Sequence, residues 1–235
     1  VPLIGLAYLA FYVLTTHPCA SLVGAKGAQK EEASVSAREM LTAAARNRHL
    51  RLIATVITFV FIMDELVKFQ WNVAAKAAYQ GDALIGLKAN VAFFTNLITF
   101  LLQFVLTGFL VMRLGVGGTL KLMPASISLA SLGSLFWPGV PSTTATRLVE
   151  SASRYSFNKT GTELLYLPLP VELRNRTKAF MDVFMDRMAR GIAGTLLIVL
   201  GWLNLQRIPA LSVLVIGLSA AWLVLSGKAQ KEYIL

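Results

Sequence analysis

The chain has 235 residues, of which 56% are hydrophobic and only 14% are charged, with a mean hydropathy of +0.64 and a formal net charge of +10. These values lie far from the average of soluble proteins and indicate an integral membrane protein, so we expect the lipid bilayer to be one of its partners. In such a protein a basic balance is typical of cytoplasmic Lys and Arg that set the topology, so we exclude nucleic acid as a partner.

The N-terminal part of the chain predicts two pieces. Val1–Thr16 is apolar but too short to span a bilayer, so we expect it to be the end of a truncated transmembrane helix. His17–His49 is polar and predicts a cytoplasmic linker, in which Ser36 and Glu39 form a capping box at the start of a short amphipathic helix. Placing this linker inside puts most loop Lys and Arg on the cytoplasmic side, as topology requires.

Six apolar runs follow, and each approaches or exceeds the roughly 20 residues that cross about 30 Å of hydrocarbon. None shows the alternation and turn punctuation of membrane β-strands, so the predicted fold class is all-α, a polytopic membrane helical bundle over residues 50–235. Connections such as Gln80–Leu87 are short, which favours antiparallel neighbours. The predicted spans are Leu50–Tyr79, Lys88–Met112, Val116–Phe136, Thr143–Leu167, Thr177–Leu203 and Ile208–Ser226.

Polar residues are distributed unevenly among these helices. The first carries Asp64, Lys68, Asn72 and Lys76 at every fourth position, which a 3.6-residue turn places on one face. The fourth and fifth are also charged, whereas the third offers mainly serines that suit close packing and the sixth is a nearly charge-free scaffold. Charges in hydrocarbon normally face a bundle interior or a wet cavity, so the charged helices should line one cavity.

Depth along the helix axes predicts which charges meet. At 1.5 Å per residue, Asp64 lies roughly 20 Å from the cytoplasmic edge of the first span. Arg154 enters from outside and reaches about 16 Å, and Arg190 enters from inside and reaches about 19 Å. We therefore expect these three groups to cluster near the middle of the membrane, where pairing lowers the cost of burial.

The embedded charges suit an anionic solute bound by Arg and Lys, with carboxylates that exchange protons or ion-pair partners between states. On the fourth helix a regular turn puts Arg154, Asn158 and Thr162 on one face, and we expect Lys159 or Arg187 to neutralise Glu163. The alternative of permanent internal ion pairs stays open. The candidate substrate-binding residues are Asp64, Glu65, Lys68, Asn72, Lys76, Arg154, Asn158, Lys159, Glu163, Asp182, Asp186, Arg187 and Arg190.

Other residue types give weaker signals. Gly115 predicts a tight turn between the second and third spans, and Gly191 and Gly194 permit close helix approach, but no glycine run has the spacing of a phosphate loop. Cys19 is the only cysteine, and the two histidines lack ligand spacing. No nucleophile, base and orienter set appears, so we expect no enzyme, no cofactor and no metal site.

The separation of polar and apolar helices resembles a six-helix half of the major facilitator superfamily, with the first, second, fourth and fifth helices around the cavity. Within that superfamily the chain resembles the ATP/ADP and nucleotide translocases on three segments, Asp64–Lys76, Ser153–Pro170 and Thr177–Gly194. It differs at Thr162, where Lys usually precedes the Glu, and at Lys68, where a carboxylate is common. The resemblance implies a C-terminal half, joined by the linker to a missing N-terminal six-helix half.

The resemblance also implies a function. We expect a secondary transporter, multi-pass in a bacterial cytoplasmic (inner) membrane, that exchanges ATP, ADP, other nucleotides or organic phosphate anions by alternating access. Two alternatives stay open. One is a transport-inactive membrane anchor that regulates attached soluble domains, and the other is a proton-coupled transporter of another solute.

Overall fold

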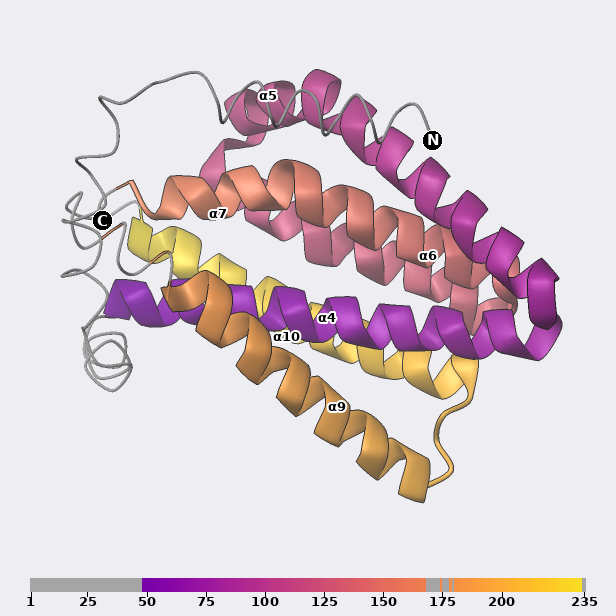
Figure 1. Ribbon diagram of the computed structural model, residues 1–235. Helices are drawn as coiled ribbons and strands as arrows, with labels where there is room; N and C mark the ends of the chain where they lie inside the picture. Colours follow the sequence, from indigo (N-terminus) through magenta and orange to yellow (C-terminus); the bar gives the residue numbers. More distant parts are fainter. Residues whose placement is uncertain (1–47, 168–173, 175–177, 179, 234–235) are drawn as a thin grey trace, which may run out of the picture. The chain divides into compact units, whose positions relative to one another are not determined.

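The computed structural model describes residues 48–167, 174, 178 and 180–233 (Figure 1). Every element in this part of the chain is helical and none is a strand, so the predicted all-α helical bundle is confirmed. The predicted truncated helix Val1–Thr16 and the linker helix lie outside the described residues. The helices are α4 (Arg48–Ala78), α5 (Gly81–Phe136), α6 (Val140–Ser153), η3 (Arg154–Asn158), α7 (Lys159–Leu165), η4 (Met181–Met185), α9 (Asp186–Trp202) and α10 (Ile208–Tyr233).

Helix α5 contains two of the predicted spans, separated at Gly115. This glycine has φ 64° and ψ −179°, a backbone conformation that side chains with a Cβ rarely adopt. The chain reverses direction there, and Figure 1 shows that the second arm of α5 folds back and runs in roughly the opposite direction to the first arm. The predicted turn at Gly115 is therefore confirmed.

Two predicted connections are too long. Gln80–Leu87 was expected to be a loop, but α5 begins at Gly81, directly after Gln80. Gly81 itself has φ 55° and makes the turn, and Asp82 lies in the first turn of α5, where a carboxylate stabilises exposed amides. Similarly, residues 137–142 were expected to connect the third and fourth spans, but α6 begins at Val140. A proline lies in the first turn of α6, a position that suits proline because its missing N–H has no partner there.

Among the described residues, three helical stretches are long and apolar enough to cross a membrane: Gly81–Phe104, Gly117–Phe136 and Ile208–Gly227. They overlap the predicted second, third and sixth spans, and the first of them lies about seven residues earlier than predicted. The described parts of the predicted first, fourth and fifth spans are also largely helical, and these spans carry more ionisable groups. That these three cross the membrane as well stays a prediction.

Helix α4 packs against α6, α9 and α10, which surround it in Figure 1. Several of its apolar side chains, among them Ile53, Met63 and Leu66, are fully buried and belong to the hydrophobic core. On α10 the buried Trp222 stacks on Phe59 of α4, with 6.3 Å between the ring centroids. The predicted sixth-span scaffold thus presents one face to α4 and leaves residues of its other face exposed.

The predicted fourth span folds as α6, η3 and α7 in succession, and we call these three elements the fourth rod. The serines of the second arm of α5 pack against this rod, as predicted for small polar residues. Ser134 and Thr146 share a hydrogen bond of 3.0 Å, and Ser126 and Ser153 lie 3.3 Å apart. Close approach also occurs at Gly161, where an added Cβ would lie 3.3 Å from Leu120 Cδ2. At Gly191 and Gly194 a Cβ would meet nothing within 4 Å, so the predicted close approach there is wrong.

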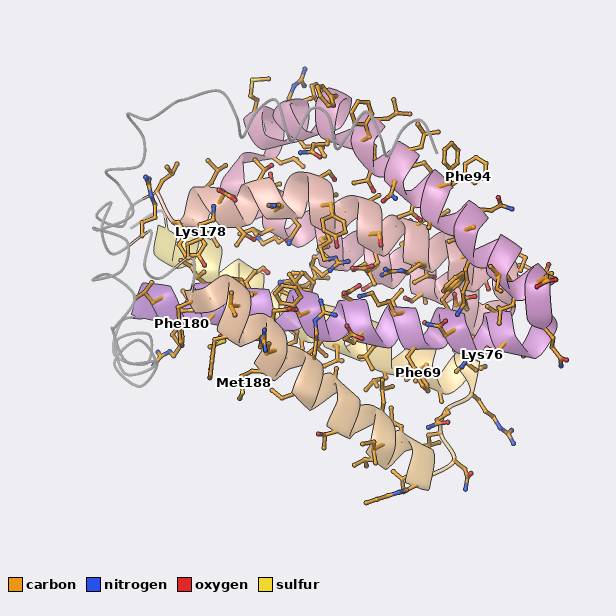
Figure 2. All side chains as sticks on the ribbon, in the orientation of Figure 1. Phe69, Lys76, Phe94, Lys178, Phe180 and Met188 are labelled. Carbon is orange, nitrogen blue, oxygen red and sulfur yellow. The ribbon has the colours of Figure 1, made fainter. Side chains whose placement is uncertain are left out.

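The first arm of α5 and the outer side of α9 carry large exposed apolar side chains. Phe93 is 63% exposed, Phe104 is 76% exposed and Met188 is 49% exposed. In Figure 2, Phe94 and Met188 both point away from the other helices. Surfaces of this kind are covered by lipid or by another part of a protein.

Candidate functional site

The site is built around Asp64, a fully buried carboxylate in the middle of α4. Three cations contact it: Lys68 Nζ at 2.6 Å, Arg147 Nη1 at 2.8 Å and Arg154 Nη1 at 2.9 Å. Lys68 lies one turn further along α4, whereas Arg147 comes from α6 and Arg154 from the first position of η3. The predicted meeting of Asp64 and Arg154 is confirmed.

A second buried carboxylate, Glu150 of α6, lies beside Asp64 and was missed by the sequence reasoning. Arg147 Nη1 is 2.5 Å from Glu150 Oε2, and Arg154 Nε is 3.0 Å from Glu150 Oε1. Ser151 Oγ donates a further hydrogen bond of 3.1 Å to Oε2. The spacing of Arg147, Glu150 and Arg154 is three and then four residues, which puts them on one helix face and was the signal available in the sequence.

The ion pairs continue from Lys68 toward α9. Lys68 Nζ lies 3.5 Å from Glu65, Arg190 Nη1 pairs with Glu65, and Arg190 Nε contacts Asp186 at 2.7 Å. We call the resulting set the charge network, with four acidic and four basic members. These members are Asp64, Glu65, Lys68, Arg147, Glu150, Arg154, Asp186 and Arg190.

Arg190 joins this network through a different carboxylate from the one predicted. It was expected to meet Asp64, but its partner on α4 is Glu65. Consecutive residues of a helix point about 100° apart. Asp64 therefore faces α6, while Glu65 faces α9, and depth along the axis alone does not separate the two.

A cavity of about 240 Å³ opens beside the network where α4, the fourth rod and α9 meet. We call it the α9-side cavity. Three of its lining residues are cationic, Arg154, Lys159 and Arg190, and Lys159 has no ion pair with any described residue. Ile57, Val60, Phe61, Tyr155, Asn158 and Thr162 complete the lining.

The fourth rod contains a π-helical turn, η3, beside this cavity. A regular α-helix would place Arg154, Asn158 and Thr162 on one face and turn Tyr155 and Lys159 onto the adjoining one. A π-turn holds more residues, which shifts the register of the residues beyond it. In this structure all five residues line the same cavity.

Several predicted site residues lie elsewhere. Glu163 was expected to pair with Lys159 or Arg187, but Lys178 Nζ contacts it at 2.8 Å, on side chains that are 45% and 38% exposed. Asn72 donates to the Lys68 carbonyl at 2.9 Å.

Three more predicted site residues either lie outside the charge network or have a side chain that the structure does not describe. Lys76 is exposed near the end of α4 (Figure 2). Arg187 is exposed on α9. The side chain of Asp182 lies outside the described part of the structure.

Within the described residues, no group of three or more His, Cys, Asp or Glu side chains is placed to hold a metal ion. Fold and site together define an all-helical bundle with three stretches able to span a membrane and with paired charges gathered inside it. Comparison of the chain with protein-family models, with curated proteins and with solved structures finds no match in any of the three.

Proposed function

We propose that the chain is part of a secondary transporter and that the α9-side cavity binds an organic anion. The observation that carries this proposal is the convergence of Arg154, Lys159 and Arg190 on one cavity from two different rods. Guanidinium groups bind phosphate and carboxylate through paired N–H donors, so two arginines and a lysine form a strong anion site.

The charge network offers a way for a bound anion to change the conformation of the site, by breaking ion pairs. Without a ligand, Arg154 is held by Asp64 and Glu150, and Arg190 by Glu65 and Asp186. An entering anion competes with these carboxylates for the same guanidinium groups. The ion pair of Arg190 with Glu65 joins α9 to α4, so capture of Arg190 by a ligand would release this ion pair between the two helices.

The small volume of the α9-side cavity supports a binding site that this bundle forms together with a second helical bundle. Its volume of about 240 Å³ is below the roughly 300–1,000 Å³ of pockets for drug-sized ligands. The stretch Gly81–Phe104 has none of its apolar window buried among the described helices. Both features fit a missing six-helix half that closes over the cavity, and the resemblance to nucleotide translocases makes ATP or ADP the first solute to test. The same resemblance proposes a bacterial cytoplasmic membrane as its location.

A rival function has its own supporting observation. The charge network contains equal numbers of acidic and basic groups, so it needs no ligand to be neutral. Permanent ion pairs of this kind would suit a membrane anchor for attached soluble domains. Lys159, which has no ion pair among the described residues, favours the transporter, because an anchor gains nothing from a cation at a cavity that no described carboxylate neutralises.

The test is flux in sealed vesicles that contain the complete protein. Labelled ATP or ADP should exchange, and Lys159→Gln or Arg190→Gln should reduce the rate about tenfold to hundredfold, the effect of losing a charged hydrogen bond worth about 1.5–3 kcal/mol. Arg207→Gln is the matched control, since Arg207 is exposed between α9 and α10 and lines no described cavity. Absence of flux with any organic anion favours the anchor. Flux driven by pH, without competition from nucleotides, favours the proton-coupled alternative.

A further inference from the structure

A second cavity, of about 310 Å³, also borders the charge network, through Arg147. We call it the α5-side cavity, because much of its lining comes from the first arm of α5, with α4 and the fourth rod opposite. We infer that this cavity is a separate binding site for a phosphate-bearing anion. Its polar and aromatic lining consists of Trp71, Lys88, Thr95, Asn96, Arg147, Ser151 and Tyr155.

The α5-side cavity is lined by two cations, Lys88 and Arg147, and the α9-side cavity by three. Lys88 forms no ion pair with any described residue, as Lys159 forms none in the other cavity. Arg147 takes the place of Arg154 and reaches Asp64 and Glu150 through Nη1. A guanidinium carries five N–H donors, so it can hold those carboxylates and still donate to a ligand. Each cavity thus holds a lysine that has no ion pair with the described part of the chain and at least one arginine that can also donate to a ligand, and this makes each cavity attractive to an anion.

Tyr155 is shared by the two cavities. It is 51% exposed and lines both of them, and the Arg154 guanidinium carbon lies 4.4 Å from the centre of its ring. The two volumes therefore border the same network of charges. Two anions can occupy them without sharing a lining cation, since Lys88 and Arg147 belong to one cavity and Arg154, Lys159 and Arg190 to the other.

The two sites share the same counter-charges. Asp64 and Glu150 each contact both Arg147 and Arg154. An anion that draws Arg154 away leaves these buried carboxylates more dependent on Arg147, because an unpaired buried charge is costly. Occupation of one cavity should therefore weaken binding in the other. This inference does not depend on transport, since an anchor with the same lining would bind the anion as well.

Amine labelling of the full chain in detergent micelles tests the site, with ATP as the probe and peptide mass analysis as the readout. At an ATP concentration about ten times the Kd, roughly one site in ten is empty, so labelling of Lys88 should slow about tenfold. Labelling of Lys76, which is exposed and lines neither cavity, should not change. Lys159 reports the α9-side cavity in the same experiment.

Two variants show whether protection arises inside the α5-side cavity. Ala92 is exposed and lines it, so Ala92→Phe should fill the cavity and abolish protection of Lys88. Ala89→Phe is the matched control, because Ala89 is exposed on the same arm but lines neither cavity. Protection of Lys159 without protection of Lys88 would overturn the inference and leave the proposed function standing. Protection of Lys88 that survives Ala92→Phe would overturn it too, and protection of Lys88 alone would support it while counting against the α9-side site.

Discussion

Replacing Glu150 by glutamine should destabilise the bundle far more than any surface substitution in the same rod. Glu150 has no exposed area and contacts both Arg147 and Arg154. The change keeps the shape of the side chain but leaves two arginines in contact with only one buried carboxylate, Asp64. Removing one partner of a buried ion pair costs about 3–5 kcal/mol. For a unit of this size, Tm falls about 2–4 °C per kcal/mol, so the expected decrease is about 6–20 °C.

The control is the same substitution at Glu163, in the following part of the same rod. Its pair with Lys178 is exposed on both sides, and exposed pairs contribute less than about 1 kcal/mol. Thermal unfolding of the full chain in detergent, followed by tryptophan fluorescence, measures both variants. Adding Arg147→Gln to Glu150→Gln restores equal charge and should recover part of the lost stability. Equal Tm values for the two single variants, or strictly additive losses in the double variant, would refute the idea that Glu150 balances buried arginines.

Three further predictions use other parts of the bundle. Lys159→Gln should lower the ATP concentration that gives half-protection of Lys88 from amine labelling, because the two cavities share counter-charges; an unchanged or higher concentration would contradict the coupling. Gly161→Val should lower Tm in the same unfolding assay, since its Cβ would lie 3.3 Å from a leucine methyl, whereas Gly191→Ala meets nothing within 4 Å and should be neutral or slightly stabilising through helix propensity. Arg190→Gln should reduce the flux about tenfold to hundredfold while changing the free energy of unfolding by less than about 1 kcal/mol, since its side chain is 42% exposed; a large loss of stability would make Arg190 a structural residue.

Depth along a helix was the most useful quantity that the sequence supplied. It placed Asp64 and Arg154 at similar heights on two antiparallel rods, and the two side chains are 2.9 Å apart. Depth depends only on the rise per residue and on where a helix begins, and both are local properties. The same calculation failed for the partner of Arg190, because choosing between Asp64 and Glu65 requires the rotation of α4 against its neighbours.

Glu150 and Arg147 show a second limit. They lie early in the predicted fourth span and were passed over in favour of Arg154, although their spacing placed them on its face. Only packing against Asp64 shows that the carboxylate is fully buried and needs both arginines. Burial is a property of the assembled bundle, and a single helix does not contain that information.

The sequence by itself determined that this protein is helical and apolar and that the chain turns at Gly115. Hydropathy, helix rise and glycine conformation each depend on only a few neighbouring residues. It also determined which rods carry the charges. Tertiary structure decided how those charges pair and which of them meet in a cavity. The physical reason is that the rotation of each helix about its axis is set by contacts between helices that lie far apart in the chain.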